Sequence, residues 1–191
     1  MVAEIEPDWS HVERIISRYE EAPAACHDYD PRAPQVAAFI ARAINRHSAD
    51  VSIEHIGSTS VPSCAGKGVI DLMVIYPEGR LETVKTLLDA LGFQRQSTRD
   101  PFPESRPMRI GSIEYYGTVF RIHAHVIAAD SPEPEGLRLF RDRLRADPKL
   151  LADYVARKKM IIRSGVTDSV DYSMEKDDFI KRAVRSAQTT Q

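Results

Sequence analysis

The sequence has few cysteines, no long hydrophobic run and no marked excess of charge of either sign. Only Cys26 and Cys64 occur in the 191 residues, which excludes a framework of disulfides and agrees with a reducing compartment. The longest apolar run, at 69–76, is far shorter than the roughly 20 residues that a membrane-spanning helix needs. The N-terminal residues also lack the basic and then apolar pattern of a secretory signal. We therefore expect a cytoplasmic protein with no membrane partner.

The charge balance argues against one further class of function. The chain carries 26 basic and 28 acidic residues, which gives a formal net charge of −2. General nucleic-acid binding depends on an excess of lysine and arginine, and this chain has none.

Apolar residues recur at helical spacing near both ends of the chain. Residues 10–21 begin with the S-x-x-E spacing of a capping box and carry an apolar stripe, which predicts a first helix. From about residue 134 onward the pattern is again helical, with breaks at Pro148 and Gly165. Two further helices are expected at 36–44 and 81–91.

The middle of the chain has the pattern of strands. Residues 69–76 form an almost continuous apolar run, typical of a strand covered on both faces, and residues 118–128 alternate between apolar and polar side chains. A short strand is expected at 51–56, so residues 57–68 form a loop that joins two strands, and the Pro-rich stretch 97–107 is predicted to be a long surface loop. Strands in the middle and helices at both ends indicate an α/β or α+β fold with a helical C-terminal part.

The loop after residue 56 begins with GSTS and has the composition of a phosphate-binding turn. Gly57 lets the backbone approach a ligand closely, and Ser58, Thr59 and Ser60 supply hydroxyl groups at the start of a short helix, where anions are favoured. The alternative interpretation is a tight turn in which the hydroxyl groups only cap the helix.

A single carboxylate, Asp71, lies inside the apolar run at 69–76. Burying a carboxylate there is costly unless it is paired, hydrogen-bonded or bound to a metal ion, so we expect Asp71 to be functional. In the strand at 118–128, Arg121, His123 and His125 share the face opposite the apolar residues. If the two strands are neighbours, Asp71 and the two histidines form one cluster.

Other candidate residues lie near the same motif or on the C-terminal helices. His55 precedes the Gly57 turn and is either a general base or a hydrogen-bonding partner of the loop. Lys67 and Arg121 are candidates to neutralise a phosphate. Lys158 falls among apolar helical positions, where its ammonium group either reaches solvent or meets an anion.

Three blocks of the sequence resemble the GrpB family, a nucleotidyltransferase-like group that is sometimes fused to dephospho-CoA kinase: IEHIGSTSVPSCAGKGVIDLMV, RIHAHV and FRDRLRADPKLLADYVARKK. The segment YDPRAPQVAAFIARAI is similar to the start of that family. The resemblance implies a polymerase-beta-like nucleotidyltransferase fold, with a mixed sheet and flanking helices. It divides the chain into an N-terminal helical extension at 1–28 and a single domain at 29–191.

The chain departs from the broader superfamily at one position. That fold carries a Gly-Ser turn followed by a strand with two alternating acids, with a third acid on a neighbouring strand, but here Met73 stands where the second acid is expected. Two imidazoles and one carboxylate, from His123, His125 and Asp71, suit a transition metal better than magnesium. The hypothesis is therefore a replaced metal site that prefers manganese, zinc or iron. In the alternative interpretation, the histidines line a polar groove or pair with carboxylates.

These features predict a nucleotidyltransferase-like protein that binds a nucleotide or another phosphorylated small molecule. In an enzyme, the Gly57-Ser58 turn would hold the phosphates, and Asp71, with a metal ion, would serve nucleotidyl transfer. Two alternatives use the same residues: a ligand- or partner-binding module that lost catalysis with the second acid, and a metal-dependent hydrolase with water as the acceptor.

Overall fold

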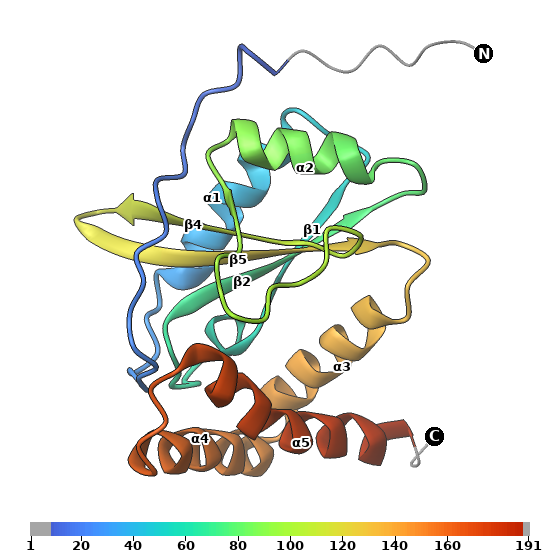
Figure 1. Cartoon of the computed structure of the whole chain (residues 1–191). Helices are drawn as coiled ribbons and strands as arrows, with labels where there is room; N and C mark the ends of the chain where they lie inside the picture. The colour runs from blue at the N-terminus through green and yellow to red at the C-terminus, as the bar shows by residue number, and fades with distance from the viewer. Residues whose placement is uncertain (1–8, 189–191) are drawn as a thin grey trace.

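A mixed five-stranded sheet lies between two groups of helices in the computed structural model, which describes residues 9–188 (Figure 1). The helices are α1 (Ala33–Asn45), α2 (Leu81–Ala90), α3 (Glu133–Ala146), α4 (Pro148–Arg163) and α5 (Ser169–Gln188), with a short 3₁₀ helix, η1 (Ser58–Ser60). The strands are β1 (Ser52–Ile56), β2 (Val69–Tyr76), β3 (Gln94–Arg95), β4 (Met108–Tyr115) and β5 (Thr118–Ala128), in the spatial order β1-β2-β5-β4-β3. This α/β architecture confirms the fold class expected from the sequence.

The two faces of the sheet are covered by helices from different parts of the chain. Helices α1 and α2 lie on one face, and α3, α4 and α5 lie on the other (Figure 1). The larger core packs α1 and α2 against alternate residues of the central strands, such as Leu72 and Ala124, while Met73 packs with Ile127 in a smaller cluster on the opposite face. The apolar run of β2 is therefore buried on both faces, as its sequence predicts.

Strands β2 and β5 pair in parallel at the centre of the sheet, and the other pairs are antiparallel. In this register Asp71 lies beside His123, and Met73 lies beside His125. Because side chains alternate along a strand, Asp71 and both histidines project from the face that carries α3 to α5. The pairing that the cluster requires is thus present.

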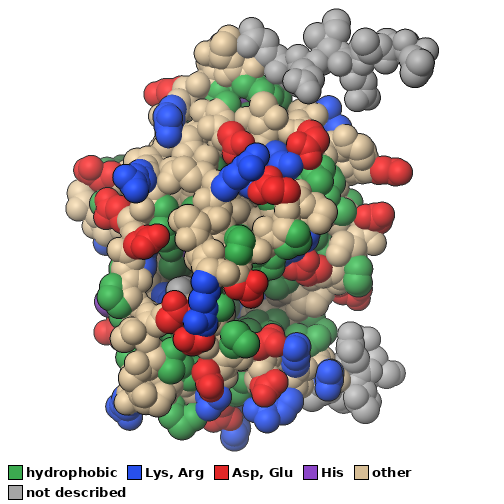
Figure 2. All heavy atoms as spheres, in the orientation of Figure 1, with side chains coloured by type: hydrophobic (Ala, Val, Ile, Leu, Met, Phe, Trp, Pro, Cys, Tyr) green, Lys and Arg blue, Asp and Glu red, His purple; other side chains and the backbone are tan. Residues whose placement is uncertain are grey.

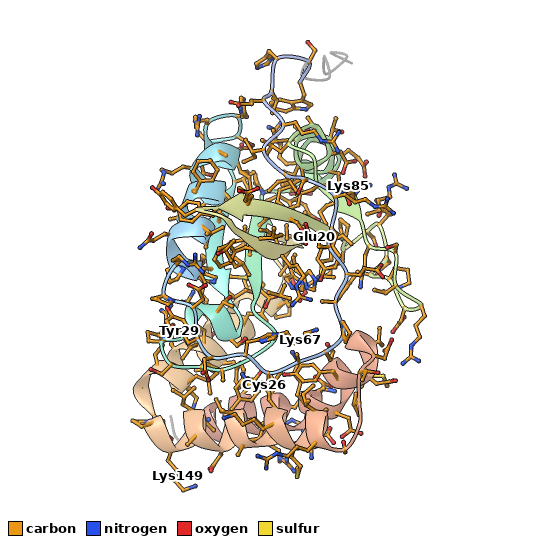
Figure 3. The ribbon with its side chains drawn as sticks, turned by 90° about the vertical axis from the view of Figure 1, so that its left-hand side faces the viewer. Glu20, Cys26, Tyr29, Lys67, Lys85 and Lys149 are labelled. Carbon is orange, nitrogen blue, oxygen red and sulfur yellow. The ribbon has the colours of Figure 1, made fainter. Side chains whose placement is uncertain are left out.

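The helix predicted at 10–21 is wrong. Residues 9–28 contain no helix: after a turn at residues 10–11, the segment runs along the sheet toward the C-terminal helices (Figures 1 and 3). Ser17 exchanges two backbone hydrogen bonds with Ser112 of β4, at 2.8 and 3.1 Å, and Ile16 is buried against the backbone of Gly111. Pairing with the sheet edge outweighs the local preference for a helix, because it satisfies backbone groups and buries Ile16 together. The boundary between residues 28 and 29 stays a prediction.

Strand β4 follows the predicted loop at 97–107 and was not recognised in the sequence. The second residue of β4, Arg109, is fully buried. Because arginine is usually exposed, its presence does not indicate a core strand in the sequence. The guanidinium group lies 2.9 Å from the carboxylate of Asp89 on α2 and 3.0 Å from that of Glu104. These ion pairs make the burial tolerable and tie β4 to α2 and to the loop that precedes the strand.

The outer strand β1 is covered by arginines of α3. Arg138 and Arg141 form ion pairs with Glu54 at 2.6 and 3.1 Å, and Arg141 also donates to the backbone carbonyl of His55 at 3.3 Å. Helix α3 is thereby fixed against the edge of the sheet.

Within residues 9–188, no helix combines the length and the apolar character needed to span a membrane. On the face drawn in Figure 2, basic and acidic side chains are interspersed rather than gathered by sign.

Candidate functional site

Asp71, His123 and His125 form one compact cluster, as predicted. Oδ1 of Asp71 lies 3.5 Å from Nδ1 of His123 and 3.5 Å from Nε2 of His125. One ligand atom from each of the three residues falls within 4.8 Å of the others. Two ligands of a tetrahedral zinc ion, at bond lengths of about 2.0–2.1 Å, are separated by about 3.4 Å. These separations would let a single ion contact all three ligand atoms, and two nitrogens with one oxygen are a ligand set that zinc, manganese and iron accept.

Partial burial shapes the electrostatics of the cluster. The side chains of Asp71, His123 and His125 are 24, 16 and 18% exposed. Burial raises the pKa of the Asp71 carboxyl, but the facing imidazoles outweigh this effect and hold its pKa well below the usual range. Burial lowers the pKa of His123, against the opposing influence of Asp71. A carboxylate beside a neutral imidazole is the protonation state that a metal ion requires.

Each histidine has a second partner from a segment far away in the sequence. The hydroxyl group of Tyr19, in the N-terminal segment, lies 3.0 Å from Nε2 of His123. Arg106, at the end of the loop before β4, lies 3.3 Å from Nδ1 of His125 and forms an ion pair with Glu133 on α3. These contacts fix the orientation of both rings.

The Gly57 turn lies directly against Asp71. Gly57 has φ 69° and ψ −172°, a conformation open almost only to glycine. A Cβ atom at this position would lie 2.2 Å from Oδ2 of Asp71, so a side chain and the carboxylate cannot share the space. Glycine therefore has two purposes here, the backbone conformation and the close approach to the acid.

Thr59, Ser60 and His55 brace the turn. The hydroxyl group of Thr59 donates to the carbonyl of Val69 at 3.0 Å, and that of Ser60 donates to the carbonyl of Gly57 at 2.7 Å. Nε2 of His55 lies 3.0 Å from the Thr59 oxygen; because that hydroxyl group already donates, the imidazole is the donor. Of the two interpretations of this motif, these hydrogen bonds match the tight turn for Thr59 and Ser60.

His55 is separated from the cluster. It pairs with Leu72 in the sheet, so it faces away from Asp71, and it lines a cavity of about 450 Å³ with Tyr29 and Arg145. Burial lowers the pKa of His55 to about 4. The geometry matches a hydrogen-bonding partner of the loop more closely than a general base at the cluster.

Cationic side chains lie near Asp71 on the side of α5. Lys67 lies between the sheet and the C-terminal helices (Figure 3), and Arg121 donates to its backbone carbonyl at 2.6 Å. Lys67 and Lys176 both lie over the ring of Tyr172, at 5.1 and 5.2 Å. Burial lowers the pKa of Lys67 to about 8 and also lowers that of Lys176. Partly buried cations next to a glycine turn favour an anionic ligand.

The side chains of Ser58 and Lys158 both lie close to Gly66, in the same loop as the Gly57 turn. A Cβ atom on Gly66 would lie 2.7 Å from Oγ of Ser58 and 3.3 Å from Nζ of Lys158, so both polar groups adjoin the backbone of that glycine. The buried ammonium group of Lys158 donates to the carbonyl of Ala65 and to Sγ of Cys64, the latter at 3.2 Å. The ammonium group of Lys158 is therefore hydrogen-bonded to the loop and does not reach solvent, so Lys158 stabilises the loop conformation.

Sequence reasoning missed Tyr19, Arg106 and Lys176. Tyr19 lies in the segment 10–21, where the sequence predicts a helix that does not form, and Arg106 lies in a loop with no periodic pattern. Lys176 follows Tyr172 by one turn of α5, the spacing that brings two side chains together, but the partner Lys67 comes from a distant loop.

Comparisons with known proteins agree with the fold and with the sequence blocks. The family model described as GrpB protein matches residues 23–186. The UPF0157 protein SCO7215 of Streptomyces coelicolor is 33% identical over 175 residues, which cover 91% of this chain and 89% of that protein. The UPF0157 protein VC_A0354 of Vibrio cholerae is 32% identical over 138 residues, 72% of this chain and 68% of that protein.

Two solved structures have folds similar to that of this chain. The conserved protein GrpB from Enterococcus faecalis superposes with a TM-score of 0.66 at 26% identity, covering 87% of this chain and 98% of that one. The Cid1 poly(U) polymerase, in a structure with Mg and 3′-dATP bound, gives a TM-score of 0.50 at 14% identity, covering 72% of this chain and 44% of that one. The second likeness shows a nucleotidyltransferase-like fold and nothing about activity.

Proposed function

We propose that this chain, which belongs to the GrpB family, binds a nucleotide or another phosphorylated small molecule and catalyses a metal-dependent nucleotidyl or phosphoryl transfer. The proposal rests on one observation: three features of the structure lie close together. The Asp71 cluster, the glycine turn in contact with its carboxylate, and the cations on the α5 side lie side by side.

Each part has a separate task in this proposal. Asp71, His123 and His125 would hold a divalent ion, which supplies positive charge to a phosphate oxygen. Gly57 admits the phosphate chain close to the backbone, and Lys67 and Lys176 offset its negative charge. Tyr19 orients the imidazole of His123, as outer partners of metal ligands usually do.

Binding without catalysis is the second candidate, and Met73 favours it. Its side chain is fully buried and packs with Ile56, Ile75 and Ile127, so the position of the missing acid is part of the core. With one carboxylate instead of two or three, the site offers fewer oxygen ligands than a pair of magnesium ions needs.

The deciding experiment combines the purified protein with the four ribonucleoside triphosphates in the presence of Mg²⁺, Mn²⁺, Zn²⁺ or Fe²⁺. Binding is measured by calorimetry and turnover by product analysis. Transfer to an acceptor, with Mn²⁺, Zn²⁺ or Fe²⁺ more effective than Mg²⁺, supports the proposal. Release of phosphate to water alone indicates the hydrolase, and binding without turnover indicates the non-catalytic module. No binding of any triphosphate excludes a nucleotide as the ligand in all three.

The lowered pKa of Lys67 predicts how nucleotide affinity depends on pH. Its pKa of about 8 results first from burial and then from Lys176 and Arg121, and Asp71 and Asp168 oppose the shift. A bound phosphate stabilises the charged form, so affinity should be constant below about pH 8 and fall by up to tenfold per pH unit above it. The measurement is the dissociation constant of a nucleotide between about pH 7 and pH 9.5.

Lys67→Arg is the matched variant for this measurement, because a guanidinium group stays charged over the whole range. We expect its affinity to decline much less above pH 8. If both proteins lose affinity in parallel, the titrating group is not Lys67.

A further inference from the structure

We infer that Arg106 controls entry of a metal ion into the Asp71 cluster, and that the ion binds through His125 only after Arg106 has moved away from that ring. The inference rests on the proposed metal site and adds a residue that governs its occupation.

The contact between Arg106 and His125 sets the position of the imidazole proton. Nη1 of Arg106 lies 3.3 Å from Nδ1 of His125. A guanidinium group only donates hydrogen bonds, so Nδ1 accepts with its lone pair. The proton of the neutral ring then resides on Nε2, the atom that faces Oδ1 of Asp71 at 3.5 Å.

This arrangement removes one ligand from the metal site. A metal ion binds to a nitrogen lone pair, and Nε2 of His125 has none while it carries the proton. With Arg106 in place, the cluster offers Asp71 and His123 but not His125. In this geometry the three side chains are in close contact, and His125 must change tautomer before the cluster can hold an ion with three ligands.

Arg106 occupies the place where a metal-binding histidine usually has an acceptor. The second ring nitrogen of a ligating histidine generally donates to a carboxylate or a carbonyl. Here the nearby carboxylate is Glu133, and Arg106 binds it with two guanidinium nitrogens, one of them 2.9 Å from Oε2. The arginine thus stands between His125 and an acidic group.

Arg106 lies at the end of a loop on the protein surface. Arg106 lies over the ring of Phe102, 4.5 Å from its centroid, and the rings of Phe102 and His125 are nearly perpendicular, with centroids 5.9 Å apart. Phe102 is 42% exposed, and the residues from Asp100 to Ser105 have little regular structure. Displacing Arg106 therefore requires rearrangement of an exposed loop rather than of the core.

The experiment measures Mn²⁺ and Zn²⁺ affinity directly, by calorimetry, for the wild type and for Arg106→Gln. A glutamine carbonyl accepts a hydrogen bond from Nδ1 and so favours the metal-binding tautomer. We expect the affinity to rise by about tenfold or more, corresponding to loss of one charge-assisted hydrogen bond. Arg138→Gln, which removes an α3 arginine paired with Glu54, is the control and should leave the affinity unchanged.

A second measurement separates this effect from simple removal of positive charge. In a His125→Ala background, Arg106→Gln should no longer raise the affinity, because the arginine acts through that ring. Nitrogen NMR of the His125 side chain should show the proton on Nε2 in the metal-free wild type and on Nδ1 with zinc bound. Thermal unfolding confirms that each variant is folded.

The outcomes distinguish the inference from the proposed function. Equal affinity of the wild type and Arg106→Gln, or a gain that persists without His125, overturns the role of Arg106 and leaves the metal site in place. If neither protein binds metal in a manner that depends on Asp71, the proposed metal site itself fails, and the inference fails with it.

Discussion

Asp71→Asn should lower the affinity for Mn²⁺ or Zn²⁺ by about a hundredfold or more and remove any transfer activity, with the protein still folded. The substitution keeps the size of the side chain and replaces the only carboxylate of the cluster with a neutral amide. Truncating one partner of a buried, hydrogen-bonded charge pair costs about 2–5 kcal/mol, and 2.8 kcal/mol is about a hundredfold. Calorimetry with each metal ion gives the affinity, and the nucleotide assay gives the activity.

Glu54→Gln is the control for this substitution. Glu54 pairs with Met73 in the register of β1 and β2 and therefore shares a face with Asp71, but its carboxylate binds Arg138 and Arg141 on α3. We expect metal affinity in this variant close to that of the wild type. Metal binding that survives in Asp71→Asn would show that the ion lies elsewhere.

Gly57→Ala should lower both nucleotide and metal affinity, on the order of a hundredfold, although it adds only one methyl group. The φ of 69° with ψ of −172° makes alanine unfavourable by about 1–3 kcal/mol. The larger effect comes from the collision with Asp71, because the new Cβ would lie 2.2 Å from Oδ2 and 3.0 Å from Cγ. Either the carboxylate leaves its position between the histidines, or the turn moves away from it.

Gly68→Ala provides a matched control in the same loop. Gly68 also has a positive φ, of 71°, but a Cβ atom there meets nothing within 4 Å. Gly68→Ala therefore introduces backbone strain from a positive φ but no collision. We expect it to lower the stability of the protein modestly and to leave ligand affinity unchanged. Comparable binding losses in both variants would mean that loop conformation, and not contact with Asp71, decides the affinity.

The central sheet and the cluster could be predicted because their signals are local and strong. The apolar run of β2 permits few interpretations other than a buried strand, and the alternation of β5 fixes which residues share a face. Once these strands are neighbours, Asp71 and the two histidines must lie on the same side. The solitary acid was informative because a carboxylate is rarely left unpaired inside such a run.

The missed features depend on contacts between distant segments. The N-terminal segment carries a helical pattern, but its conformation is decided by hydrogen bonds to Ser112 and by a site for Ile16 beside Gly111. Strand β4 contains a buried arginine whose partners are 20 and 5 residues away in the sequence, so its own composition does not mark it as core. Tertiary pairing outweighs local propensity in both places.

Both borders of the sheet are partly covered, by different means, and this bears on how the protein behaves at high concentration. Open strand edges promote aggregation, because a second chain can add to them in register. On one border the arginines of α3 place positive charge and donors in front of β1. On the other, next to the two-residue edge strand β3, the N-terminal segment is hydrogen-bonded to β4. An approaching strand would have to displace an ion-paired helix or a buried isoleucine. Removing the N-terminal segment should therefore cost the protein its resistance to self-association as well as the tyrosine that contacts His123.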